Sequence, residues 1–154
     1  MDLDLPQKDP YLYILMRSDL DSLNPGKMVA QGAHAANQFT HKVEAFQEAV
    51  KSDEDASHPT NAKQQYVVNL FSQWKTSTPD GFGVTICLDI LGDQLPLVVD
   101  AANNFRCIAG VTRDPSYPIL DGKVIHSLPL DTCGYVFGDK SDLRILLGQF
   151  DLLK

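Results

Sequence analysis

Residues 11–36 read YLYILMRSDLDSLNPGKMVAQGAHAA, and this stretch sets the pattern for the chain. Tyr11–Arg17 is rich in aromatic and branched side chains, which predicts a buried β-strand. Asn24-Pro25-Gly26 has turn chemistry. From Lys27 small and apolar residues recur at helical spacing, which predicts a helix that continues through Val50. A strand that leads into a long helix is typical of an α/β fold.

The rest of the chain repeats this alternation of strands and helices. Its periodicity predicts further helices over residues 62–75, 94–105 and 140–149, and further strands over residues 83–89, 106–112 and 131–137. We therefore expect a three-layer α/β/α sandwich with a central mixed sheet of about four strands.

The connecting segments carry turn residues. Residues 52–61 are polar and contain a proline, so they are expected to form a surface loop. Asp121-Gly122 stands between branched residues and suggests a hairpin excursion within residues 113–130. Because 154 residues are scarcely enough for two cores, residues 1–154 are expected to form a single domain, with residues 1–10 as a loose arm.

The composition is that of a globular protein: 44% of the residues are hydrophobic and 21% are charged. No apolar run is long enough to span a bilayer, and the first residues do not resemble a signal peptide, so a cytoplasmic protein without membrane contacts is expected. The three cysteines occupy apolar stretches and predict small buried side chains. Without a CxxC or HExxH pattern, neither a metal nor another cofactor is expected. A net charge of −7 is unfavourable for binding nucleic acid.

The predicted helix that starts at Lys27 carries three polar side chains in one stripe. Lys27, Gln31 and His34 are spaced i, i+4 and i+7, which places them on the same helix face. Lys27 also lies in the first turn, where free backbone N–H groups and the helix dipole favour an anion. Such a stripe can form the polar wall of a cleft, or it can be an ordinary solvated face.

These residues also carry a family resemblance. The strand followed by Arg17-Ser18-Asp19-Leu20, then Gly26-Lys27, Gln31 and His34-Ala35-Ala36, resembles the opening of type 2 peptidyl-tRNA hydrolases, a small α/β family that frees tRNA from stalled peptides. A later strand that ends in Arg113-Asp114 and another that contains Thr132 are similar as well. The segment Asp114-Pro115-Ser116-Tyr117-Pro118 departs from the family pattern, which usually has Ala-Gly, a basic residue and Thr after the aspartate.

The resemblance implies hydrolysis of the ester between a peptide and the terminal ribose of tRNA, with peptidyl-tRNA as the partner and no cofactor. The implied catalytic residues are Lys27, His34, Asp114 and Thr132, and the implied substrate-binding residues are Gln31, Arg113, Ser116, Tyr117 and Lys123. Asp114 would orient or deprotonate water, Lys27 would stabilise negative charge, and Thr132 would bond water or substrate.

Several alternatives stay open at this point. Tyr117 either stacks on a terminal base or anchors its loop on the sheet. Lys63 and Lys75 are further candidates for phosphate contacts, whereas Arg17 and Asp19 are expected to shape a loop. The chain either hydrolyses peptidyl-tRNA or is an inactive relative that binds RNA or protein, and a homodimer is possible. An unrelated α/β hydrolase is disfavoured because no G-x-S-x-G elbow is present.

Overall fold

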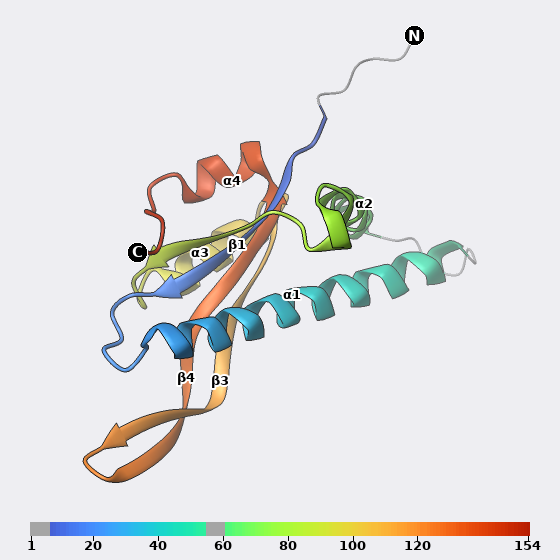
Figure 1. The fold of residues 1–154 in the computed structure, drawn as a ribbon. Coiled ribbons are helices and arrows are strands. Elements are labelled where there is room, and N and C mark those ends of the chain that lie inside the picture. The colour runs from blue at the N-terminus through green and yellow to red at the C-terminus, as the bar shows by residue number, and fades with distance from the viewer. Residues whose placement is uncertain (1–6, 55–60) are drawn as a thin grey trace.

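The computed structural model describes residues 7–54 and 61–154 and contains one central four-stranded sheet (Figure 1). The elements in chain order are β1 (Pro10–Arg17), α1 (Pro25–Glu54), α2 (Ala62–Thr76), the 3-10 turn η1 (Pro79–Gly81), β2 (Thr85–Ile90), α3 (Leu95–Asn103), β3 (Ile108–Asp121), β4 (Val124–Asp139) and α4 (Lys140–Leu147). The sheet order is β2-β1-β4-β3, in which β1 pairs parallel with β2 and antiparallel with β4, and β3 pairs antiparallel with β4. The predicted mixed sheet of an α/β fold is confirmed.

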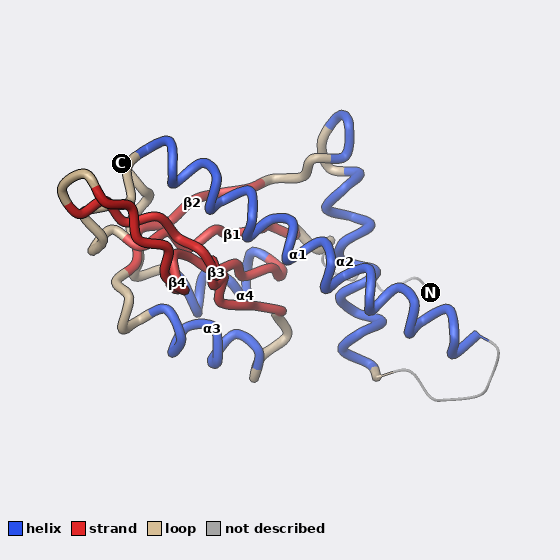
Figure 2. The backbone as a smooth tube through the Cα atoms, turned by 90° about the horizontal axis from the view of Figure 1, so that it is seen from below, coloured by secondary structure: helices blue, strands red, loops and turns tan. Residues whose placement is uncertain are grey.

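Helices cover both faces of this sheet. Helices α1 and α2 lie on one face and helices α3 and α4 on the other, which Figure 2 shows with the sheet between them. Each face has its own cluster of buried apolar residues. The expected three-layer arrangement is therefore present in the described part of the chain.

Strand β1 divides its side chains between the two layers. Leu12, Ile14 and Met16 belong to the cluster under α1 and α2, whereas Leu15 belongs to the cluster under α3 and α4. Successive side chains of a strand point to opposite faces, so this assignment follows from the period of two residues. Because both faces are covered, the sequence of β1 is an almost continuous apolar run rather than a polar–apolar alternation.

An aromatic cluster fixes α1 and α2 to the sheet. Phe39 of α1 is completely buried and contacts four rings, those of Phe71, Trp74, Tyr135 and Phe137, at centroid distances of 4.8–5.7 Å. Edge-on and tilted pairs at these distances are favourable beyond the area that they bury. The cluster holds the middle of α1 against β4 and so orients the first half of the helix along β3.

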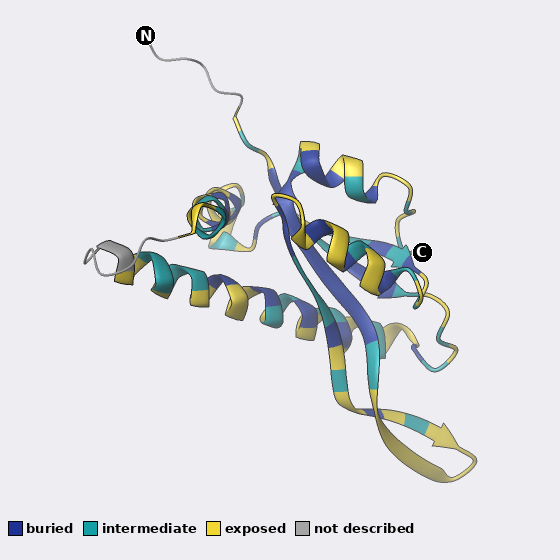
Figure 3. Cartoon of the chain, turned by 180° about the vertical axis from the view of Figure 1, so that it is seen from behind, coloured by how far each residue is buried: buried dark blue, intermediate teal, exposed yellow. Residues whose placement is uncertain are grey.

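Strands β3 and β4 continue beyond the sheet as a long two-stranded arm (Figures 1 and 3). The arm turns at residues 122–123, where Gly122 has a φ of 61°, so the predicted hairpin is confirmed. Residues 113–130 were expected to be an excursion separate from the strands, but they continue both strands. Register shifts between Thr112 and Arg113 and between Asp114 and Tyr117 accommodate the irregular, proline-containing segment within the ladder.

Two boundary predictions need correction. The loose arm was expected over residues 1–10, of which residues 1–6 lie outside the described residues. Asp9 is held by β4 and α4, since its amide donates to Asp139 Oδ1 at 2.7 Å and its carbonyl accepts from the Lys140 amide at 2.8 Å, and Pro10 is already part of β1. The loop expected over residues 52–61 is shorter at its start, because α1 continues through Glu54; residues 55–60 lie outside the described residues.

Among the helices of the described residues, none combines the length and the apolar character needed to cross a bilayer.

Candidate functional site

The first half of α1 lies along β3, and three side chains of the helix bond to the strand in order. Lys27 Nζ donates to the Pro118 carbonyl at 2.9 Å, Gln31 Nε2 donates to Asp114 Oδ2 at 2.7 Å, and Gln38 Nε2 donates to the Val111 carbonyl at 3.1 Å. The numbers rise along the helix while they fall along the strand, so the two elements run antiparallel. We call this line of contacts the α1–β3 seam.

Gln31 is the central residue of the seam. Its amide nitrogen donates to Asp114, and its amide oxygen accepts from Thr132 Oγ1 at 2.6 Å, so one side chain links α1, β3 and β4. Cys133 Sγ also donates to the Gln31 carbonyl at 3.3 Å. Gln31 is only 4% exposed. Gln31 is therefore neither part of a solvated helix face nor part of the wall of the pocket beside Asp114, but a buried polar link between the helix and the sheet.

Thr132 is buried and does not line the pocket, contrary to the expectation. It was expected to bond water or substrate, but it is completely buried, and its hydroxyl is occupied by Gln31. Gln31, expected to contact substrate, is likewise nearly buried. In this conformation both residues position Asp114 and are not part of the exposed surface of the site.

The Asp114 carboxylate is held at both oxygens. Oδ1 accepts from the Ser116 amide at 2.9 Å and Oδ2 accepts from Gln31, and these two bonds are the main reasons that the pKa of Asp114 is lowered. Nearby His34 lowers this pKa further. The carboxylate is therefore ionised at neutral pH. A carboxylate has about four lone-pair positions, so it retains capacity for a further donor such as water.

An open pocket of about 420 Å³ lies beside this carboxylate. It is lined by His34, Gln38, Thr112, Arg113, Asp114, Pro115 and Ser116. The predicted residues His34, Arg113, Asp114 and Ser116 thus meet at one place, although they come from α1 and from the start of the arm. His34 is exposed, which leaves its imidazole accessible to a molecule in the pocket.

Lys27 occupies the end of the seam nearest the arm. Its ammonium bonds to the Pro118 carbonyl and lies 5.0 Å from the centroid of the Tyr117 ring. The ion pairs of the described residues do not include one between Lys27 and Asp114. Lys27 precedes Gln31 by four residues, which is a rise of about 6 Å along a helix, so it lies roughly one turn from the residue that bonds Asp114.

Tyr117 anchors its segment, and the prediction that it stacks on a nucleotide base is wrong for this conformation. The residue is completely buried, and its hydroxyl lies 3.1 Å from Ser22 Oγ in the loop before α1. A buried ring has no free face for a base. Its contacts instead fix the arm to the start of α1, directly below the Lys27 ammonium.

The two arginines beside the site are both engaged with carboxylates. Arg113 makes a bidentate pair with Asp131, at 2.8 and 3.2 Å, and its guanidinium remains largely exposed. Arg17 pairs with Asp19 and donates to the Asp131 carbonyl at 2.9 Å, while Asp19 accepts from the Gly92 amide. Arg17 and Asp19 therefore shape the loop after β1, as expected.

Three other predicted contact residues lie away from the pocket. Lys123 is at the exposed tip of the arm. Lys63 donates to the Asn103 carbonyl, and Asn103 precedes β3. Asp114 lies six positions beyond Ile108, the first residue of β3, which is about 20 Å along a strand. Lys75 lies in the last turn of α2, beside Gly81. Lys63 and Lys75 do not line the pocket beside Asp114, and a phosphate contact by either lysine remains a prediction.

Gln38 and Thr112 line the pocket and were missed. Thr112 Oγ1 donates to Gln38 Oε1 at 2.8 Å, and the pair closes the inner end of the seam. The sequence contains a signal for Gln38, because Lys27, Gln31, His34 and Gln38 continue one stripe with steps of four, three and four residues. No comparable signal marks Thr112, which depends on the strand register.

The thiols do not enter the site as reactive groups. Cys107 and Cys133 are buried, and Cys87 is partly exposed. Burial raises the pKa of the Cys87 thiol to about 11 and that of Cys107 to about 12. Within residues 7–54 and 61–154, no group of three His, Cys, Asp or Glu side chains is arranged to hold a metal ion.

A scan of the chain against models of known protein families finds no match, and a search of curated proteins finds none either.

Proposed function

We propose that this protein is a peptidyl-tRNA hydrolase, which cleaves the ester between a peptide and the terminal ribose of tRNA. The observation that carries the proposal is the Gln31 bridge, which presents an ionised Asp114 to an open pocket that His34 also lines. The opening motif, in which the family resemblance is strongest, supplies both Gln31 and His34 as well as Lys27. Asp114 accepts a partly buried hydrogen bond from Gln31 and a second one from the Ser116 amide, which favours a positioned functional group over a free surface charge.

In the proposed reaction a water molecule attacks the ester carbonyl carbon. Asp114 accepts a hydrogen bond from this water and directs its lone pair, while its lowered pKa keeps it ionised and makes it a weak base. His34 accepts the proton that the water loses, since an imidazole can accept and donate protons near neutral pH. The same imidazole then protonates the leaving ribose oxygen as the carbon–oxygen bond breaks. The products are a peptide with a free carboxyl group and tRNA with a free terminal hydroxyl.

Lys27 provides the positive charge for this scheme. A lysine ammonium has three donor protons, and one of them bonds to the Pro118 carbonyl. The remaining two are available to the tetrahedral oxyanion or to the terminal phosphate of the tRNA. Lys27 also lies in the first turn of α1, at the positive end of the helix dipole, which favours negative charge.

Recognition of tRNA is expected to be weak and strongly dependent on salt. The net charge of −7 repels phosphate, and two arginines near the pocket are already paired with carboxylates. Lys27, the exposed guanidinium of Arg113 and Lys123 at the arm tip are the proposed phosphate contacts. A cytoplasmic location and a homodimer remain predictions from the sequence.

Release of free tRNA from an N-acetyl-aminoacyl-tRNA tests the proposal. The wild type is expected to accelerate release in the presence of EDTA, and Lys27→Ala and Asp114→Asn are each expected to slow it by about 100- to 1,000-fold, the scale of one lost transition-state contact. Lys42→Ala on the exposed side of α1 and Asp121→Asn at the arm tip are matched controls that should retain full activity. Binding of the substrate without turnover by the wild type would instead favour the inactive relative.

The pH profile gives a second test. Because the pKa of Asp114 lies below its usual range, the carboxylate limb of kcat/KM is expected to fall only below about pH 4. His34→Gln is expected to lower kcat, because it removes the imidazole that transfers the proton. An unchanged kcat in His34→Gln, or a carboxylate limb well above pH 4, would contradict this division of roles.

A further inference from the structure

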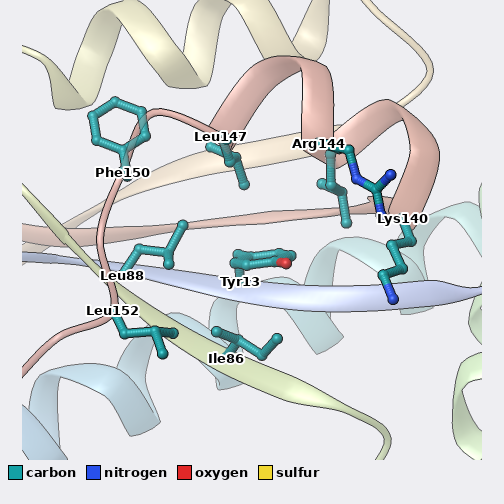
Figure 4. Close-up of a pocket in the computed structure, with 10 residues that line it drawn as sticks. Tyr13, Ile86, Leu88, Lys140, Arg144, Leu147, Phe150 and Leu152 are labelled. Atoms are coloured by element: carbon teal, nitrogen blue, oxygen red, sulfur yellow. The ribbon is translucent and has the colours of Figure 1, made fainter.

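A second pocket, of about 220 Å³, lies on the face of the sheet opposite the α1–β3 seam (Figure 4). Strands β1 and β2 form its floor, and α4 with the segment that follows it forms its wall. Leu88, Leu147, Phe150 and Leu152 provide an apolar end. It shares no lining residue with the pocket beside Asp114.

The other end of this pocket is cationic. Figure 4 shows the Tyr13 hydroxyl directed toward the end at which the charged groups of Lys140 and Arg144 lie. Burial and Tyr11 raise the pKa of Tyr13, whereas Lys140 and Arg144 lower it, which indicates that both cations act on this hydroxyl. The pocket therefore combines an apolar body with two positive charges and one hydroxyl at a single end.

Within residues 7–54 and 61–154, neither of these two cations forms an ion pair with a carboxylate. The Lys140 ammonium lies over the Tyr11 ring, 5.3 Å from its centroid, and Lys140 begins α4, where the helix dipole disfavours a cation. Helix stability therefore does not explain the position of Lys140. In a chain with a net charge of −7, two unpaired cations beside an apolar pocket are complementary to an anion.

We propose that this pocket binds a small free carboxylic acid whose apolar body is about the size of one ring. An apolar cavity of about 150 Å³ is large enough to hold benzene, so about 220 Å³ accommodates a ring with a short chain. The carboxylate lies between Arg144 and Lys140, because a guanidinium bonds a carboxylate through two parallel N–H donors and an ammonium adds a point charge. The Tyr13 hydroxyl donates a further hydrogen bond. The site is independent of the proposed hydrolase activity.

Titration of the full chain with 3-phenylpropionate, followed by amide NMR, tests this site. The acid is expected to bind saturably with a Kd on the order of 1 mM, which is ordinary for a ligand of this size, and to shift the amides of Leu88, Gly148 and Leu152. Arg144→Gln is expected to weaken binding about tenfold or more, and Lys140→Gln to weaken it as well. Lys123→Gln removes a remote exposed cation and should leave binding unchanged.

Binding of the neutral amide 3-phenylpropanamide distinguishes the contribution of the cationic end of the pocket from that of the apolar end. It has the same apolar body and is expected to bind at least about tenfold more weakly than the acid. Equal binding of the amide, unchanged binding in Arg144→Gln, or the absence of saturable shifts with the acid would each overturn the proposal. Because Arg144 is exposed, its replacement should leave the fold intact, which the unshifted amides of α1 would report.

Discussion

The Gln31 bridge makes a quantitative prediction about stability. Replacement of Gln31 by Leu introduces an apolar side chain of similar size, and it removes the donor to Asp114 Oδ2 and the acceptor for Thr132 Oγ1. A hydrogen bond to a charged group contributes about 1.5–3 kcal/mol, and a buried hydroxyl left without a partner costs about 1–3 kcal/mol. Burial of the apolar leucine side chain offsets part of this loss of stability. We therefore expect Gln31→Leu to lower the free energy of unfolding by about 2–4 kcal/mol.

For a chain of this length, such a loss corresponds to a fall in Tm of about 5–15 °C. Urea unfolding at pH 7 measures the free energy directly. Gln73→Leu, an exposed glutamine on α2, is the matched control and should change the free energy of unfolding by less than about 0.5 kcal/mol. The pKa of Asp114, followed by carboxyl NMR, should also rise in Gln31→Leu because one of its two main hydrogen bonds is lost.

A double-mutant cycle with Thr132→Val distinguishes the loss of the hydrogen bond between Gln31 and Thr132 from a general loss of core packing. In the wild type, Thr132→Val leaves the Gln31 amide oxygen buried without a donor. In Gln31→Leu the same change removes an orphan hydroxyl and should cost little or nothing. A coupling of at least about 1 kcal/mol is expected between the two positions. Additive losses together with an unchanged pKa of Asp114 would refute the bridge as the element that holds the site.

Two further predictions concern the turn glycines and an ion pair. Gly83 and Gly122 have φ values of 65° and 61°, but a Cβ at Gly83 would lie 2.0 Å from Trp74 Cε2, whereas one at Gly122 meets nothing within 4 Å. Gly122→Ala should cost about 1–2 kcal/mol and Gly83→Ala clearly more, about 3 kcal/mol or above, so equal losses in urea unfolding would contradict the packing described. The hydrogen bond from Arg17 lowers the pKa of Asp19, so this pair stabilises the fold above the unfolded pKa of about 4 and is lost as the pH falls through the lower folded pKa. Asp19→Asn should therefore lose less stability than the wild type between pH 6 and pH 2.5, and parallel urea midpoints for the two proteins would argue against it.

The spacing of apolar residues predicted most of the helices and strands, because burial on one or both faces of an element determines which of its positions are apolar. The strand at Tyr11–Arg17 and the helix from Lys27 through Val50 lie within β1 and α1. The segment 113–130 was harder, because its three prolines favour a loop when the pairing partner is unknown. In the structure, bulges and the edge position of β3 let this segment remain in the ladder.

The candidate site was only partly predictable. The helical stripe placed Lys27, Gln31 and His34 together, since their spacing depends on the helix alone. Which of them is exposed depends on the distance between α1 and the sheet, and that distance buries Gln31 while His34 stays open. The burial of Tyr117 likewise depends on the fold of the arm, which local sequence does not specify.

The rate of tRNA release from N-acetyl-aminoacyl-tRNA, measured under single-turnover conditions, tests the central claim most directly. The wild type should release tRNA far faster than the uncatalysed reaction, and Asp114→Asn should be slower by about 100-fold or more while Asp121→Asn matches the wild type. A wild type no faster than the uncatalysed reaction, or an Asp114→Asn variant as fast as the wild type, would contradict it.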